Sequence, residues 1–152
     1  MEQTLTLSPL QLRQLLFTRV RVEARYSAEE APSHWAPSFD FSDTEIQLNV
    51  EMGERENDDP SVGHDYRMGV RLQLVPSESE DNGIPYLVDV EASAWLRFID
   101  QSLAAAKRRS VVEVNGASMI IGAIRDEVAR ITARSALGTL TLPTLRIIPT
   151  ER

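Results

Sequence analysis

Residues that could carry out acid–base or metal chemistry are sparse in this chain. The two histidines, His34 and His64, both lie in stretches predicted to be loops. An aspartate follows His64, but one histidine beside one acid lacks the nucleophile of a catalytic triad, so a solvated turn is the simpler interpretation. Asp58 and Asp59 lie in an acidic loop without the burial that separates two carboxylate pKa values, and their spacing does not match a calcium-binding loop.

Basic and nucleotide-binding motifs are equally weak. The run Lys107–Arg109 is most simply the C-terminus of a helix, since so few bases do not make a nucleic-acid surface. The glycines are scattered singly, so no phosphate-binding loop is visible. The chain has no cysteine, which excludes a thiol nucleophile and a cysteine zinc cluster. We therefore expect no enzyme activity, no metal site and no cofactor.

Length and charge narrow the class of protein further. The 152 residues suit one domain, 1–152. The formal net charge of −7 argues against nucleic acid or an anionic membrane as partner and suits a basic or unfolded partner. No apolar run approaches the roughly 20 residues that span a bilayer, and the N-terminus lacks the pattern of a signal peptide. We therefore expect a cytoplasmic protein without membrane insertion.

The elements that could position functional side chains begin with strands. Apolar and polar residues alternate with a period of two over 46–52, 66–74 and 86–94, which is typical of half-buried antiparallel strands. Acidic, turn-rich loops at 53–63 and 76–85 join these runs, so the three predict a meander. In the last run the residues predicted to face outward are Leu87, Asp89 and Glu91.

An earlier strand is predicted at 17–26, where Val20 and Val22 alternate with arginine and glutamate. The residues before it are ambiguous. Ser8-Pro9 could start a short helix, or the following leucines could extend the strand, and we favour the extended conformation.

Near residue 98 the period changes from two to 3.6, which predicts helices. The segment 100–109 has an acid at its start and bases at its end, in agreement with a helix dipole. Asn115 is a plausible N-cap for a second, longer helix. The apolar ridge of that helix, which should cover the sheet, consists of Ile120, Ile124, Val128 and Ile131.

Some apolar residues exceed what one small core needs. Trp35 lies in the proline-containing loop 27–38, and a tryptophan in such a loop usually packs onto something. Leu137, Leu140 and Leu142 follow the second helix. Together these residues could form a subunit interface, cap the sheet edge or line a groove for extended peptides, in that order of preference.

Three stretches of the chain, within about residues 17 to 143, resemble the SecB family of protein-export chaperones. The long helix and its exit resemble the family's long helix at Asn115-Gly116, Arg125-Asp126, Thr132-Ala133-Arg134 and Leu140-Thr141-Leu142-Pro143. Trp35-Ala36-Pro37 is similar to the W-x-P of the family's crossover loop. Leu87-Val88-Asp89-Val90 and Val22-Glu23-Ala24 are similar to its L-x-E-V and F-E-A strand segments. At Gly122-Ala123 the chain lacks an aromatic residue and a proline of the family pattern.

This resemblance implies an α+β fold, in which two helices pack on one face of a four-stranded antiparallel sheet, a meander with a crossover loop. It also implies assembly as a homotetramer, a dimer of dimers. Carried over by position, the apolar client-binding groove of the family would contain Trp35, Ile120, Ile121, Ile124, Leu137 and Leu140. The translocase ATPase SecA docks on the family's acidic sheet face, and the matching positions here are Glu23, Leu87 and Asp89.

The function implied is that of an ATP-independent holdase, which binds unfolded polypeptides or preproteins for export. SecB-like chaperones that stabilise one partner, such as the antitoxin of a toxin–antitoxin module, are the alternative. The breadth of the client range distinguishes these two hypotheses.

Overall fold

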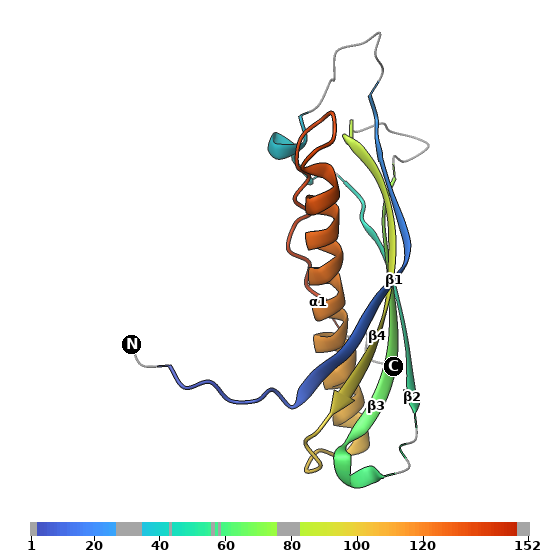
Figure 1. The fold of residues 1–152 in the computed structure, drawn as a ribbon, viewed down its shortest axis with the longest axis vertical. Coiled ribbons are helices and arrows are strands. Elements are labelled where there is room, and N and C mark those ends of the chain that lie inside the picture. The colour runs from blue at the N-terminus through green and yellow to red at the C-terminus, as the bar shows by residue number, and fades with distance from the viewer. Residues whose placement is uncertain are drawn as a thin grey trace.

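The computed structural model describes residues 3–26, 35–42, 44–55, 57, 59–75 and 83–148. Its elements are one open antiparallel sheet and, among the described residues, one α-helix that lies across one face of it (Figure 1). The strands are β1 (Leu10–Ala24), β2 (Gln47–Arg55), β3 (His64–Leu74) and β4 (Tyr86–Phe98). The helix is α1 (Ala105–Thr132), and two 3-10 turns are η1 (Ala36–Ser38) and η2 (Pro60–Val62).

The strand order is β1-β4-β3-β2, with every neighbouring pair antiparallel. Strands β2, β3 and β4 form the predicted meander, and the chain crosses from one sheet edge to the other between β1 and β2. The residues before 17 are extended, as favoured from the sequence, and β1 starts at Leu10. The crossover explains why β1, first in the chain, can pair with the last strand.

Burial alternates along the two central strands, as the period-two pattern predicts. In β3 and β4 the residues facing α1 are buried, and the alternate residues are partly or fully exposed. The inward set consists of Tyr66, Met68, Val70, Leu72, Leu74, Tyr86, Val88, Val90, Ala92, Ala94, Leu96 and Phe98. The sheet therefore has an inner face against the helix and an outer face toward solvent.

The prediction of two helices is wrong, because α1 runs without a break from Ala105 to Thr132. Asn115 is an exposed residue in the interior of α1 rather than an N-cap. The apparent break at Gly116 has another cause: a Cβ built there would lie 2.6 Å from Leu96 Cδ1 and 3.0 Å from the Met68 methyl. Gly116 is thus required by close helix–sheet packing and does not mark a helix start.

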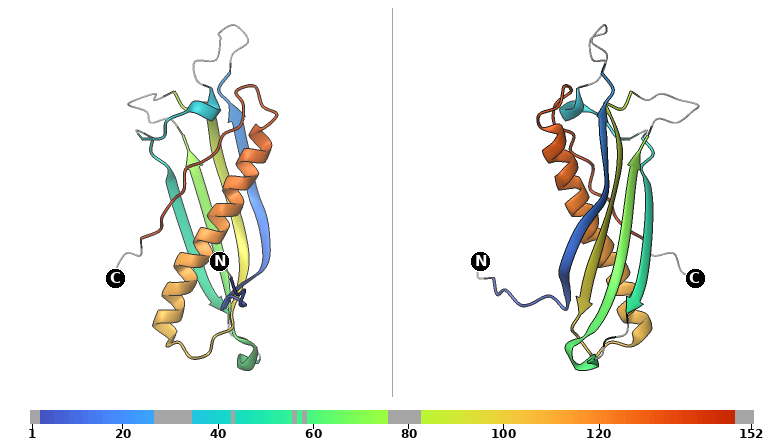
Figure 2. Two further views of the ribbon diagram at one scale, coloured as in Figure 1. Left: turned by 90° about the vertical axis from the view of Figure 1, so that its left-hand side faces the viewer. Right: turned by 45° about the vertical axis from the view of Figure 1, so that its right-hand side comes forward.

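The side of α1 that meets the sheet is a ridge with a step of four residues. Such a row is inclined to the helix axis, and α1 accordingly crosses the sheet diagonally (Figure 2, left). The buried members of this row are Arg108, Val112, Gly116, Ile120, Ile124, Val128 and Thr132. The predicted ridge is confirmed at Ile120, Ile124 and Val128, whereas Ile131 is only partly buried.

After α1 the chain turns and returns as an extended segment, residues 139–148, beside the helix on the inner face of the sheet (Figure 2, left). Leu140 and Leu142 in this segment are fully buried. Two polar contacts attach it to the helix: Leu140 N donates to Thr132 Oγ1 at 2.8 Å, and Arg125 Nε donates to the Leu142 carbonyl at 3.0 Å. The extended segment therefore completes the core that α1 begins.

Candidate interaction surfaces

Trp35 is the most accessible residue of the predicted groove, with 55% of its surface exposed. It is fixed at the end of α1 where the chain turns. The next residue, Ala36, donates its N–H to the Leu137 carbonyl at 2.9 Å. A Cβ built on Gly138 would lie 3.0 Å from Trp35 Cζ2, and Gly138 has φ +81°. The indole therefore packs on Gly138, where any other residue would have a strained backbone and a Cβ crowded against the ring.

Next to Trp35, polar contacts from β4 hold the turn after α1. The hydroxyl of Tyr86, from β4, donates to the Gly138 carbonyl at 2.6 Å and accepts from Leu137 N at 3.2 Å. Burial raises the pKa of Tyr86, so this hydroxyl keeps its proton. The structure thus brings Trp35, Leu137 and Leu140 to the same end of the molecule.

The aliphatic members of the predicted groove are core residues in this structure. Ile120, Ile124 and Leu140 are fully buried, and Ile121 and Leu137 are 3% and 1% exposed. Ile120, Ile121 and Ile124 belong to the middle of α1. Of the predicted groove residues, Trp35 is therefore the accessible one, and the other five lie in the packed interior.

A second apolar surface, which the sequence analysis missed, follows the free edge of the sheet. Strand β1 pairs with β4 along one side, and several of its apolar side chains are exposed. These are Leu12 at 41%, Leu16 at 52%, Phe17 at 37% and Val20 at 45%. The sequence did not reveal this apolar edge because the alternation of apolar and polar residues is interrupted in β1. The register shifts between Leu12 and Gln14 and again between Phe17 and Arg19.

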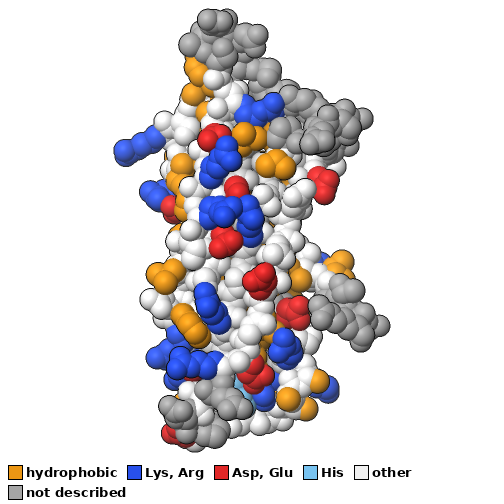
Figure 3. Space-filling view, turned by 90° about the vertical axis from the view of Figure 1, so that its right-hand side faces the viewer, with side chains coloured by type: hydrophobic (Ala, Val, Ile, Leu, Met, Phe, Trp, Pro, Cys, Tyr) orange, Lys and Arg blue, Asp and Glu red, His pale blue; other side chains and the backbone are white. Residues whose placement is uncertain are grey.

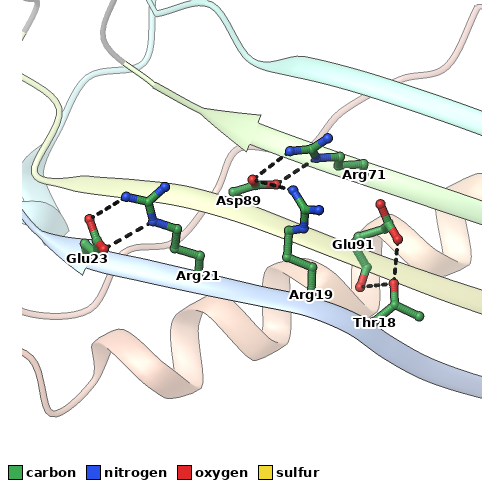
Figure 4. A network of polar contacts seen from close by, with 7 residues as sticks. All are labelled: Thr18, Arg19, Arg21, Glu23, Arg71, Asp89 and Glu91. Atoms are coloured by element: carbon green, nitrogen blue, oxygen red, sulfur yellow. Dashed lines mark hydrogen bonds and ion pairs between the residues drawn. The ribbon is translucent and has the colours of Figure 1, made fainter.

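The predicted docking residues lie together on the outer face. Glu23 and Leu87 are register partners across β1 and β4, and Asp89 follows two residues along β4. Asp89 accepts from Arg71 Nε at 2.9 Å and Nη2 at 2.8 Å, and from Arg19 Nη1 at 3.2 Å (Figure 4). The arginines, Arg71 first, hold the pKa of Asp89 below its ordinary value.

Glu23 is also occupied, since Arg21 donates to both of its carboxylate oxygens at 3.1 and 3.2 Å (Figure 4). The docking residues of the resemblance are thus present on one face, but both carboxylates already have arginine partners.

The outer face as a whole is rich in arginine, which differs from the acidic face that the resemblance implies. Blue side chains are prominent along the sheet in Figure 3, with the red ones interspersed among them. The outward arginines of the four strands are Arg13, Arg19, Arg21, Arg55, Arg67, Arg71 and Arg97. The outward carboxylates are fewer: Glu23, Glu51, Asp65, Asp89 and Glu91.

A cluster of titratable side chains near the start of α1 has a structural role. Arg108 is 8% exposed; its Nε donates to the Tyr66 hydroxyl at 2.9 Å, and its Nη2 lies 3.4 Å from Glu54 Oε1. Burial raises the pKa of Tyr66, while Arg108 opposes this shift. His64 Nδ1 is 3.7 Å from the same glutamate oxygen. The cluster therefore joins α1 to β2 and β3.

Two of the sequence predictions fail at this cluster. His64 is the first residue of β3 rather than part of a loop. Lys107–Arg109 lies near the start of α1, not at a helix C-terminus. His34 and Asp58 lie outside the described residues. Within the described ranges no group of three or more possible metal ligands gathers, and no helix there has the uninterrupted apolar length that a membrane crossing requires.

Comparisons with known proteins relate this chain to others at the level of the fold. No family model matches the sequence, and no curated protein matches it. A solved SecB-like chaperone of Mycobacterium tuberculosis, in complex with an antitoxin peptide, is 17% identical over 90% of each chain, with a TM-score of 0.48. A protein of unknown function from Streptococcus agalactiae is 10% identical over 88% of this chain and 96% of that chain, with a TM-score of 0.53.

Proposed function

We propose that this protein is a binding protein rather than an enzyme: a cytoplasmic, ATP-independent holdase that binds extended apolar segments of unfolded polypeptides, as SecB does. The observation that carries the proposal is the exposed Trp35 beside the hydrogen-bonded turn at the end of α1. Large aromatic residues held in place are the usual energetic centres of binding surfaces.

The fold supports this proposal. The sequence motifs that resemble SecB led us to expect a four-stranded antiparallel sheet with a crossover and two helices on one face; the sheet order β1-β4-β3-β2 agrees with that expectation, and one helix, α1, covers the face among the described residues. The residues at the Trp35 end of the proposed groove come from two of the matching stretches: Trp35 from the crossover connection, and Leu137 and Leu140 from the exit of the long helix.

The energetics of client binding follow from this arrangement. An apolar client side chain placed on Trp35 removes apolar surface of both partners from water, which is worth about 1.5–3 kcal/mol for one large side chain. Backbone pairing of an extended client with an open sheet edge adds affinity that is independent of client sequence. Leu137 and Leu140 would form the base of the groove at Trp35, and Ile120, Ile121 and Ile124 would continue it along α1 toward the middle of the helix.

The test is suppression of aggregation. A chemically denatured model client is diluted into buffer without nucleotide, and light scattering is followed with and without an equimolar amount of this protein. We expect suppression by the wild type and a loss of at least about half of it in Trp35→Ser, since truncating a central aromatic typically costs more than 1 kcal/mol. Trp35 suits the test because aspartate at the fully buried Ile124 or Leu140 would disturb folding itself.

Val62→Ser provides the matched control. Val62 is 43% exposed and belongs to η2, at the opposite end of the sheet from Trp35 (Figure 1). Aggregation that proceeds unchanged at an excess of wild-type protein would exclude the holdase proposal. Equal effects of the two substitutions would exclude Trp35 as the binding centre.

A dedicated chaperone for one partner, such as an antitoxin, is the second candidate function. It is favoured by the burial of the aliphatic groove residues, which leaves a small accessible surface around Trp35 and suits a narrow client range. Affinity capture from a lysate, quantified with and without Trp35→Ser, separates the candidates: many unrelated proteins indicate a general holdase, and one specific protein indicates a dedicated partner.

The export part of the SecB activity adds docking of the translocase ATPase SecA at Glu23, Leu87 and Asp89. In this chain both carboxylates are engaged by arginines. The observations therefore favour client binding over SecA docking. Assembly as a dimer of dimers also belongs to the proposal, and the free edge of β1 is the surface that suits it.

A further inference from the structure

The outer face of the sheet contains a trough that client binding does not use. Gly53 of β2 and Gly69 of β3 both point outward, and a Cβ built on either glycine meets no atom within 4 Å. They line a hollow of about 460 Å³ together with Thr18, Glu51, Arg67, Arg71 and Glu91. Glycine within a strand often marks a place where another backbone approaches closely.

Next to the trough, two arginines converge on one indole. Arg67 is the register partner of Trp95, and its guanidinium carbon lies 5.9 Å from the ring centroid. The guanidinium carbon of Arg55 lies 6.0 Å from the same centroid. A second hollow of about 460 Å³ adjoins Trp95, and Arg13 and Arg97 line it as well. The ring thus gathers cations at one place on the face.

Arg55 and Arg67 have no carboxylate within ion-pair distance among the described residues, although Arg67 Nε donates to Ser93 Oγ at 3.4 Å. Two neighbouring arginines on the same face do have carboxylate partners and form bidentate ion pairs with them. Arg71 binds Asp89, and Arg97 binds Asp65, each through two nitrogens. A carboxylate brought to Arg55 and Arg67 can form the same two-pronged, charge-assisted contact and relieve the repulsion between the two cations.

From these observations we propose that the outer sheet face binds an extended acidic segment of a partner protein. The segment lies over β2 and β3, its backbone over Gly53 and Gly69 and its carboxylates on Arg55 and Arg67. Outward residues of a strand and the side chains on one face of an extended peptide share a spacing of roughly 6.6 Å, so alternate acidic residues match this face.

An acidic peptide fits better than nucleic acid. Glu51, Asp65 and Glu91 are interspersed among the arginines and would repel a continuous phosphate backbone. The net charge of −7 also gives the whole protein no long-range attraction for a polyanion. A short segment with spaced carboxylates avoids the first penalty, and it meets less of the second because it carries fewer charges than a nucleic acid.

Fluorescence anisotropy tests this proposal with a labelled twelve-residue peptide of alternating glutamate and serine, and with the corresponding lysine–serine peptide. We expect the full-length protein to bind the glutamate peptide, more weakly as salt rises, and not the lysine peptide. Arg55→Glu and Arg67→Glu should each weaken binding at least about tenfold, as loss of a charge-assisted contact implies. Arg109→Glu changes the net charge equally on the exposed side of α1 and should leave binding within about twofold.

Gly69→Val tests the trough separately. The valine side chain has free space and suits a strand, so thermal melting should be unchanged or slightly raised while the glutamate peptide binds at least about tenfold more weakly. No binding of the glutamate peptide by the wild type overturns the proposal, as does equal weakening by Arg109→Glu. Tighter binding of a labelled oligothymidylate makes the face a nucleic-acid site instead. Self-association that Arg67→Glu abolishes, without peptide binding, makes it an interface between copies.

Discussion

Single side chains connect the sheet of this protein to its most exposed aromatic residue. The Tyr86 hydroxyl of β4 satisfies two backbone groups of the turn after α1, at Leu137 and Gly138. That turn in turn receives the N–H of Ala36 beside Trp35. The single hydroxyl oxygen of buried Tyr86 therefore helps to fix the position of Trp35, the proposed binding residue, through the turn that lies between them.

Replacement of Tyr86 by phenylalanine tests this connection. The substitution removes one oxygen and leaves the Gly138 carbonyl and the Leu137 N–H without their buried partner, which should cost about 1–3 kcal/mol. For a chain of this size we expect the Tm to fall by roughly 2–4 °C for each kcal/mol lost, as measured by circular dichroism.

Tyr26→Phe is the control for that measurement, because Tyr26 is 49% exposed. Its Tm should match the wild type. If Tyr86→Phe melts with the wild type as well, water replaces the hydroxyl at no cost, and the turn is not held by Tyr86.

At the scale of the residue, sequence reasoning identified which residues of β3 and β4 face inward and which face outward, but not the contacts that those side chains make. Alternation placed Asp89 and Leu87 outward, and the structure has them there. It could not show that Asp89 is enclosed by Arg71 and Arg19, because these arginines come from two other strands. Arg108 was missed for a local reason: its burial follows from the row of every fourth residue only if the helix continues through Asn115.

At the scale of the element, the four strands were predictable because a period of two is a property of neighbouring residues. Their ends were less so. Strand β4 continues to Phe98, beyond the predicted end at 94, since Trp95 and Arg97 face outward in the same alternation. The prediction divided the helix because Asn-Gly is a local signal for a helix start. In the structure Gly116 is explained instead by its close approach to Leu96, which is distant in sequence.

The two glycines inside α1 should therefore respond in opposite ways to replacement by alanine. A Cβ at Gly116 would overlap Leu96, whereas a Cβ at Gly122 meets no atom within 4 Å. Gly122→Ala should stabilise the protein by about 0.5–1 kcal/mol through the lower flexibility of alanine. Gly116→Ala should destabilise it by about 1–3 kcal/mol, the usual cost of overpacking.

Urea denaturation of the two variants measures this difference, with each acting as the control for the other. Both replacements have the same helix propensity, so any difference between them reports on packing alone. Stabilisation by Gly116→Ala would show that the helix can move away from the sheet, and that the contact with Leu96 is not tight.

At the scale of the whole molecule, the β1 edge of the sheet and the N-terminal segment before it carry a series of exposed apolar side chains. The residues before β1 extend away from the sheet with Leu5 95% exposed and Leu7 74% exposed (Figure 1). They continue into β1, whose outer edge is unpaired in this chain and carries further exposed apolar side chains. A long apolar edge strand attracts other strands unless something covers it.

We therefore expect a second copy of the chain to cover the β1 edge, in line with the proposed dimer of dimers. Light scattering after size-exclusion chromatography should give about four times the 17.0 kDa of one chain. Val20 on β1 and Leu48 on β2 are exposed to 45% and 37% and belong to opposite edges of the sheet, so they form a matched pair. Val20→Lys should lower the mass to that of a smaller species, because a charge within an apolar interface loses its hydration without gaining a partner, whereas Leu48→Lys should leave it unchanged. A monomeric wild type at tens of micromolar, or an unchanged mass in Val20→Lys, would mean that the edge of β1 is free in solution and open to clients instead. An equal loss of mass in both variants would contradict an interface confined to the β1 edge.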